Sequence, residues 1–150
     1  MMSLKSVVVI LCFVVLQLVS ATVFKDCGTN AGTLASVDVS DCPQNTVPCP
    51  FKKGSNVTLV VKLTPTEASK GATLNLYGII AGIKTPFQTK VDACKGDITC
   101  PITQGQATTF TAVVYVQPAY PKLRLVVDVE LTSDDGKFLV CVQVPAEITD

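Results

Sequence analysis

The chain has 150 residues, with 12 basic and 12 acidic residues and neither histidine nor tryptophan. This length suits one folded domain, and the balanced charge excludes the basic surface typical of nucleic-acid-binding proteins. The lack of histidine removes the usual general base of Ser-His and Cys-His catalytic sites. We therefore expect a protein that is not an enzyme and has no nucleic-acid partner.

Residues 1–21 have the features of a secretory signal peptide. They contain a single charge at Lys5, an apolar run from residue 7 to 16, and small residues before a cleavage point after Ala21. The apolar run is too short for a membrane-spanning helix. We expect the domain to comprise residues 22–150, with 11 basic and 12 acidic residues once Lys5 is removed.

Six apolar runs separated by proline and glycine predict β-strands. They cover residues 34–39, 57–63, 73–83, 109–116, 123–131 and 138–144, with a short additional strand near Phe24. Alternation of apolar and polar residues gives 109–116 and 123–131 one continuous apolar face each. The pair Asp135-Gly136 predicts a hairpin turn before the last run. No segment has helical periodicity, so we expect an all-β, immunoglobulin-like sandwich of two antiparallel sheets.

An even number of cysteines follows the predicted signal peptide, which itself contains Cys12. These six residues are Cys27, Cys42, Cys49, Cys94, Cys100 and Cys141. In an oxidising compartment this predicts a disulfide framework, although several pairings are open. The segments CPQNTVPC and CKGDITC could each close on themselves, which would leave the first and last cysteines for each other. Zinc binding is disfavoured because histidine and paired CxxC spacings are both absent, and we expect no metal or cofactor.

Polar residues at five positions are assigned to the surface. Asn56 begins an Asn-Val-Thr sequon. The alternation of the adjoining strand places its side chain on the solvent-facing side, so we expect N-glycosylation there. Asp134 and Asp135 lie in the predicted turn. Asp128 and Glu130 occupy the outward phase of 123–131, so we expect all four acidic side chains to be solvated rather than catalytic.

Several motifs, in this order along the chain, resemble those of the Niemann-Pick C type 2 family of the ML lipid-recognition superfamily. They are FKDCG, CPQNTVPC, GIIAGIKTPF, CKGDITCPI, AYPKLRLVVDVEL and FLVCVQVP, and together they span nearly all of residues 22–150. The resemblance implies a two-sheet sandwich with a lipid cavity between the sheets. It also implies three disulfides: Cys27–Cys141, Cys42–Cys49 and Cys94–Cys100.

The resemblance places a lipid-binding site between the sheets, with Phe87, Val116 and Tyr120 at the mouth. Deeper lining residues are expected among the inward-facing positions Val57, Leu59, Leu76, Phe110, Val114, Val127, Val129 and Val142. Periodicity alone favours a filled core at these positions. In vertebrate sterol carriers of this family, the positions matching Val129 and Val142 are tryptophan, so the substitution leaves either a larger cavity or one refilled by other side chains.

The implied function is a monomeric carrier of cholesterol or another sterol, either secreted or in the lysosomal or endosomal lumen. A docking loop formed by Ile80, Ala81, Gly82 and Ile83 is expected to meet a membrane-protein acceptor resembling Niemann-Pick C type 1.

Other functions also fit the sequence. The cargo could be a fatty acid, a phospholipid or a hydrophobic signal molecule (a semiochemical). An immune module for microbial glycolipids usually has a basic pocket rim, and here only Lys84, Lys90 and Lys122 are expected near the mouth. A structural or adhesion domain with a filled core is the third class.

Overall fold

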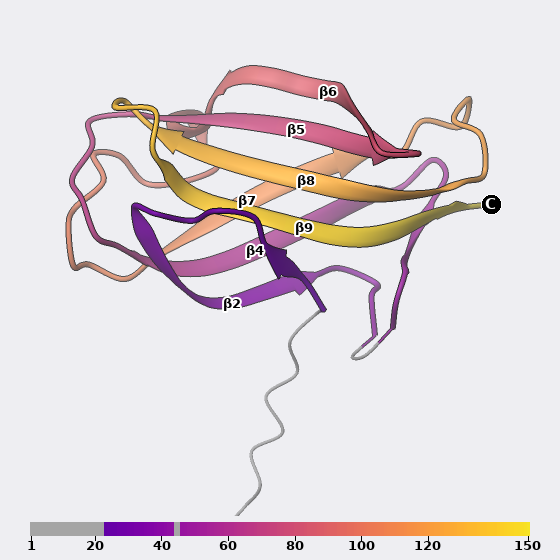
Figure 1. Ribbon diagram of the computed structural model, residues 1–150, viewed down its shortest axis with the longest axis horizontal. Helices are drawn as coiled ribbons and strands as arrows, with labels where there is room; N and C mark the ends of the chain where they lie inside the picture. The colour runs from indigo at the N-terminus through magenta and orange to yellow at the C-terminus, as the bar shows by residue number, and fades with distance from the viewer. Residues whose placement is uncertain (1–22, 44–45) are drawn as a thin grey trace, which may run out of the picture.

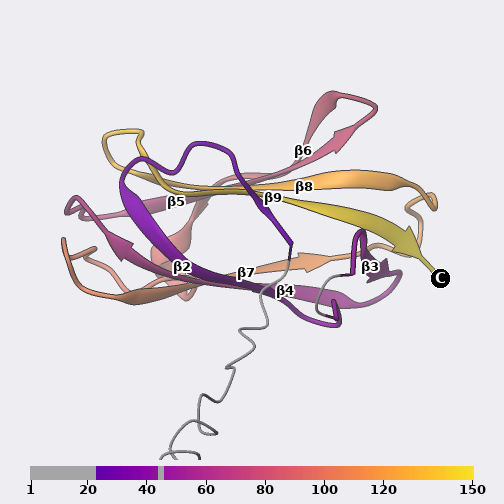
Figure 2. The same ribbon diagram turned by 60° about the horizontal axis from the view of Figure 1, so that its bottom comes forward.

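The computed structural model describes residues 23–43 and 46–150, so the predicted signal peptide lies outside the described residues. This part of the chain forms two packed β-sheets, seen as two layers in Figures 1 and 2. A single 3-10 turn, η1 (Ala93–Lys95), interrupts the strands among the described residues. The strands are β1 (Lys25–Asp26), β2 (Gly32–Val39), β3 (Cys49–Lys52), β4 (Asn56–Pro65), β5 (Ala72–Ile80), β6 (Ile83–Asp92), β7 (Thr108–Tyr115), β8 (Arg124–Ser133) and β9 (Phe138–Thr149).

The larger sheet has the strand order β1-β9-β8-β5-β6, and β3 also pairs with β9. The smaller sheet has the order β2-β4-β7. Every pairing is antiparallel except that of β3 with β9, which is parallel. The predicted all-β sandwich is confirmed, with this parallel pair as the one departure from antiparallel order among the described strands. No helix in the described residues is long and apolar enough to cross a membrane.

Side chains from the inward faces of both sheets meet in the core. Val61 of β4 lies opposite Phe110 of β7 in the smaller sheet, and both are fully buried. In the larger sheet Leu131 of β8 pairs with Val140 of β9, and neither side chain is exposed. The two-residue alternation in 109–116 and 123–131 thus reflects one apolar, core-facing side on each strand.

All three disulfides have the predicted pairing. Cys27–Cys141 joins the segment after β1 to β9 with Cα atoms 5.1 Å apart, and the corresponding distances are 5.1 Å for Cys42–Cys49 and 5.5 Å for Cys94–Cys100. The backbone N–H of Cys27 also donates to the carbonyl of Cys141 at 2.9 Å. The first bond therefore ties the start of the described domain to its last strand.

Two hairpins connect neighbouring strands of the larger sheet. The predicted turn between β8 and β9 is present, with Gly136 at φ 75° and its N–H donating to the Ser133 carbonyl. The run 73–83 was expected to be one strand, but β5 ends at Ile80 and the chain reverses into β6. Ala81 and Gly82 have φ angles of 51° and 78°, as a two-residue type I′ turn requires.

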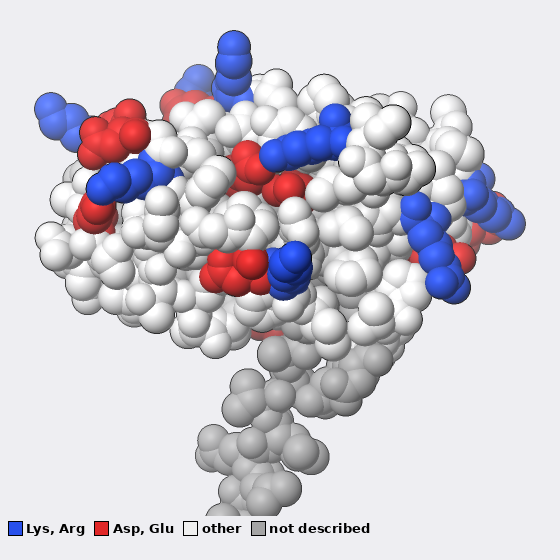
Figure 3. Space-filling view, viewed as in Figure 1, with Lys and Arg blue, Asp and Glu red and all other residues white. Residues whose placement is uncertain are grey.

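The expectation that Asp128 and Glu130 are solvated is wrong. They lie on the outer face of β8, as their phase predicts, but their exposed fractions are only 3% and 9%. Lys84 of β6 covers them, with its Nζ 2.5 Å from Glu130 Oε1 and 3.8 Å from Asp128 Oδ2. Gln143 of β9 donates to Asp128 Oδ2 at 3.2 Å. Figure 3 shows basic and acidic side chains interspersed on this face of the molecule.

Candidate ligand-binding cavity

An apolar cavity of about 250 Å³ opens between the two sheets. Its walls come from β3, β5, β6, β8 and β9 of the larger sheet, from β7 of the smaller one and from the β7–β8 connection. Strands β6 and β7 are edge strands of their sheets. The cavity therefore opens along the edge of the sandwich formed by β6 and β7. Twelve residues line the cavity: Phe51, Leu76, Phe87, Gln88, Val114, Tyr115, Val116, Gln117, Tyr120, Leu125, Val127 and Ile148.

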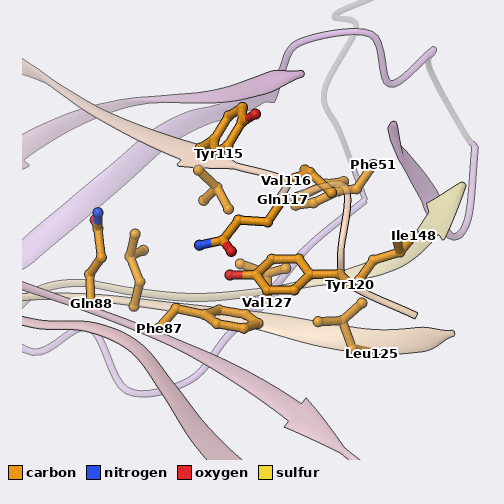
Figure 4. Close-up of a pocket in the computed structure, with 12 residues that line it drawn as sticks. Phe51, Phe87, Gln88, Tyr115, Val116, Gln117, Tyr120, Leu125, Val127 and Ile148 are labelled. Atoms are coloured by element: carbon orange, nitrogen blue, oxygen red, sulfur yellow. The ribbon is translucent and has the colours of Figure 1, made fainter. Parts of the chain in front are cut away.

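Exposure along the lining locates the mouth. Gln88, Tyr115 and Gln117 are exposed, whereas Phe51 and Leu125 are buried. The mouth thus lies between β6 and the segment that follows β7, and the buried end reaches toward β3 and the last residues of β9. Figure 4 shows these side chains around the cavity.

Two aromatic rings lie across the mouth. Phe87 of β6 and Tyr120 of the β7–β8 connection are stacked, with ring centroids 5.9 Å apart and an angle of 27° between their planes. Gly78 of β5 provides the space for Phe87, because a Cβ atom at Gly78 would lie 2.7 Å from Phe87 Cε2. The two stacked rings therefore connect β6 of the larger sheet with the β7–β8 connection on the other side of the mouth.

Six of the predicted lipid-binding residues line this cavity. They are Leu76, Phe87, Val114, Val116, Tyr120 and Val127. The other five lie in the packed core away from the lining: Val57, Leu59, Phe110, Val129 and Val142. Phe110 is fully buried and is among the largest core side chains. Val129 and Val142, which pair across β8 and β9, are 1% and 0% exposed, so the core is packed at these two positions rather than hollow.

Six lining residues were not identified from the sequence: Phe51, Gln88, Tyr115, Gln117, Leu125 and Ile148. Leu125 is in the inward phase of 123–131 and could have been included on that basis. Phe51 and Ile148 lie opposite each other in the parallel pair of β3 and β9, which has no local sequence signal. The remaining three border the mouth, where alternation ends.

No charged residue is among the twelve that line the cavity. Of the three lysines expected near the mouth, Lys84 instead binds Glu130 on the outer face of the larger sheet, and Lys122 is ion-paired with Asp150. The hydrogen bond to Glu130 is the main cause that raises the pKa of Lys84 above its usual 10.5. The Lys84 ammonium also lies 4.1 Å from the centre of the Tyr77 ring. The cavity is therefore an uncharged, mainly hydrocarbon space.

The predicted docking loop is the tip of the β5–β6 hairpin. Ile83 is 69% exposed, and Ala81 and Gly82 are exposed beside it, whereas Ile80 packs against the core. Val47, itself exposed, contributes to a shallow hollow that also includes Ala81 and Gly82. The tip is carried by the same strand, β6, that holds Phe87 at the mouth.

Asn56, the predicted glycosylation site, is the first residue of β4 and is exposed. Its backbone partner across the sheet is Tyr115 at the end of β7. The Asn56 position is therefore accessible, and its modification remains a prediction. All six described cysteines are disulfide-bonded, so none offers a thiolate ligand to a metal.

Comparison with known proteins places this architecture in a family. Residues 21–148 match the ML domain. The chain is 35% identical over 127 residues to the NPC intracellular cholesterol transporter 2 of Mus musculus, covering 84% of each chain. It is 36% identical to the ecdysteroid-regulated 16 kDa protein of Manduca sexta, covering 90% of this chain and 94% of that one.

The solved structures agree with the sequence matches. The Niemann-Pick type C2 protein of the Japanese carpenter ant superposes with a TM-score of 0.78 at 25% identity, over 85% of this chain and 99% of that chain. Chicken MD-1, in complex with lipid IVa, shares the fold with a TM-score of 0.54 at 13% identity, over 81% and 85% of the two chains. The ordered motifs, the three disulfides and these matches show that the chain belongs to the Niemann-Pick C2 family of ML-domain proteins.

Proposed function

We propose that this protein binds a lipid in the cavity between β6 and β7 and carries it to a membrane acceptor. The observation that carries the proposal is an uncharged apolar cavity whose mouth opens at the sandwich edge beneath the Phe87–Tyr120 pair. Such a space supplies hydrophobic burial, the main driving force for holding a lipid in water. The relatives named as cholesterol transporters support the same assignment.

A sterol is the first cargo to consider. For roughly 28 heavy atoms, about 0.3 kcal/mol per atom gives on the order of 8 kcal/mol, or a dissociation constant near the micromolar range. Binding of this strength suits a carrier because the cargo must also be released. Pockets for ligands of this size commonly measure about 300 to 1,000 Å³, whereas this cavity measures about 250 Å³. A sterol therefore requires Phe87 and Tyr120 to move apart.

A fatty acid or another single-chain signal molecule is the second candidate cargo, and the same small volume favours it. A flexible chain can extend from the mouth toward Phe51 and Ile148 with less displacement of the walls than a rigid ring system. Binding of microbial glycolipid is less favoured, since the lining has no cation for an anionic sugar-lipid headgroup.

Delivery would use the tip of the β5–β6 hairpin. Ile83 at this tip is 69% exposed, beside exposed Ala81 and Gly82, and belongs to the strand that carries Phe87 of the mouth. Exposed contiguous apolar surface can mark a docking site. A membrane protein resembling Niemann-Pick C type 1 is the proposed acceptor. We place the carrier, as a monomer, outside the cytosol, either secreted or in the endosomal or lysosomal lumen, where its three disulfides would be stable.

Identification of the lipid in the native protein tests this proposal. The protein is purified from its natural source without detergent, extracted with organic solvent and analysed by mass spectrometry. The expected result is one lipid class at a near-stoichiometric amount, absent from an extract of the Val116→Gln variant expressed in the same cells. Native protein that contains no lipid and binds none of the sterols and fatty acids added to it would contradict the proposal.

A further inference from the structure

We propose that the cavity selects lipids with an uncharged polar headgroup, and that Gln88, Gln117 and Tyr120 hold this headgroup at the mouth. The inference rests on the proposed function and specifies the polar end of the cargo rather than its hydrocarbon part. It follows from where the polar side chains of the lining lie, from their free hydrogen-bonding groups, and from the charges around them.

The polar side chains of the lining are confined to the mouth. Gln88 belongs to β6, and Gln117 and Tyr120 belong to the connection between β7 and β8 on the opposite lip. The N–H of Tyr120 donates to the Gln117 carbonyl at 3.0 Å, which holds these two residues in one turn. Figure 4 shows the Gln117 amide and the Tyr120 hydroxyl pointing into the same space. A bound lipid therefore finds polar partners at one end only.

These three side chains are available to a ligand. Neither glutamine amide nor the Tyr120 hydroxyl makes a hydrogen bond to another described residue. Each amide has both a donor and an acceptor, as does the phenolic hydroxyl. Together they match a hydroxyl, carbonyl, ester or amide headgroup, which needs neutral partners of both kinds.

An ionised headgroup would lack a counter-charge at this mouth. Lys84 is bound to Glu130 on the outer face of its sheet, and Lys122 is ion-paired with Asp150. Lys90, two residues beyond Gln88, does not line the cavity. A carboxylate or phosphate drawn into the mouth by its chain would lose part of its hydration without gaining a cation, and this is costly. A hydroxyl on the same chain avoids this penalty.

Competition between two lipids that differ only in headgroup tests the inference. Oleyl alcohol and oleate, below their aggregation limits, displace the fluorescent probe N-phenyl-1-naphthylamine from the disulfide-bonded protein. Near neutral pH we expect the alcohol to bind at least about tenfold more tightly than oleate. The difference should shrink at about pH 3, where a carboxyl group with a pKa of about 4.3 is largely protonated. Tighter binding of oleate than of the alcohol near neutral pH would overturn the headgroup inference and leave the carrier function standing.

Variants at the mouth test the assigned residues. Gln88→Leu and Gln117→Leu should each weaken alcohol binding about fivefold, as expected from the loss of one net hydrogen bond, without weakening octadecene, a hydrocarbon with no headgroup. Gln117→Lys should shift the preference toward oleate by supplying the missing cation. Gln104→Leu is the matched control, since Gln104 is exposed in the loop that precedes β7, at the opposite end of that strand from the mouth.

The outcomes separate the two proposals. Loss of alcohol and octadecene binding to the same extent in both leucine variants would overturn the role given to these glutamines. A wild-type protein from which no lipid displaces the probe, and which yields no lipid on extraction, would instead contradict the proposed function itself.

Discussion

Phe87 and Tyr120, which are 33 positions apart in the chain, stack across the mouth of the cavity with ring centroids 5.9 Å apart. One ring belongs to the edge strand of the larger sheet and the other to the loop that follows the edge strand of the smaller sheet. A ligand that enters between β6 and β7 must pass these rings. We therefore expect Phe87→Ala and Tyr120→Ala to weaken lipid binding while the folded state persists, because neither side chain belongs to the fully buried core.

The position of Phe87 depends on the lack of a side chain at Gly78. A Cβ atom there would lie 2.7 and 2.8 Å from two Phe87 ring carbons and 3.2 Å from Leu125. Gly78→Ala should displace the ring, lower ligand affinity and destabilise the fold by about 1 to 3 kcal/mol, as overpacking does. Chemical denaturation measures the second effect. In a Phe87→Ala background the same change should cost clearly less, and an equal cost in both backgrounds would show that the ring is not the obstacle.

Lys84 compensates the two buried carboxylates of Asp128 and Glu130. Because its pKa is raised in the folded state, its contribution to stability is complete below about pH 10.5 and is lost as the pH rises through the raised pKa. Lys84→Gln should lower the free energy of unfolding by about 1 to 2 kcal/mol near neutral pH. This is less than the loss expected on breaking a fully buried ion pair, because the lysine side chain is 46% exposed.

The pH dependence of unfolding checks this role. The loss in free energy of unfolding caused by Lys84→Gln should shrink as the pH rises above about 10.5, because wild type then loses the same contribution through the raised pKa of Lys84. If the free energies of unfolding of wild type and Lys84→Gln differed by the same amount at every pH, this role of Lys84 would be contradicted.

Val129 tests whether the cavity extends into the core. Its side chain is 1% exposed and is absent from the lining. Val129→Trp should therefore cost about 1 to 3 kcal/mol or more in stability through overpacking. Competition between a sterol and a long-chain fatty acid should give the same preference in the folded variant as in wild type. A stable variant that excludes the sterol alone would show that the cavity reaches this position when occupied.

The tip of the β5–β6 hairpin is predicted to act in delivery and not in binding. Ile83→Glu removes an exposed apolar side chain that is 69% accessible and lies outside the cavity lining. We expect unchanged lipid affinity and slower transfer to acceptor membranes that contain the partner protein. Val113→Glu is the matched control, because Val113 is an exposed valine on the other sheet. Loss of binding together with transfer would assign Ile83 a folding role.

Alternation and turn chemistry allowed much of the fold to be predicted from the sequence. The core strands β4, β7, β8 and β9 have one apolar face each, and Asp-Gly marks the last hairpin. By contrast, β6 is an exposed edge strand that contains Pro86 and lacks alternation, so nothing local identifies it. The same strand covers Asp128 and Glu130 with Lys84, and therefore the burial of these carboxylates could not be read from the phase of β8 alone.

The cavity was only partly predictable for a related reason. Inward phase identifies every core-facing residue but does not say where packing ends and the hollow begins. Val127 lines the cavity and Val129 does not, although both point inward from β8. That boundary depends on how side chains from strands distant in the sequence fill the space, which no local pattern encodes.

The most direct test of the central claim compares two valines near the end of β7. Val116 is 2% exposed and lines the cavity, whereas Val113 is 46% exposed and does not line it. Val116→Gln places an amide in the apolar space at a cost of about 1 to 3 kcal/mol, so titration with a fluorescent sterol or fatty acid should show binding abolished or weakened at least about tenfold. Val113→Gln should bind like wild type, and Val116→Ile should bind only modestly less tightly. Wild-type affinity in a folded Val116→Gln protein would contradict a lipid site between these strands.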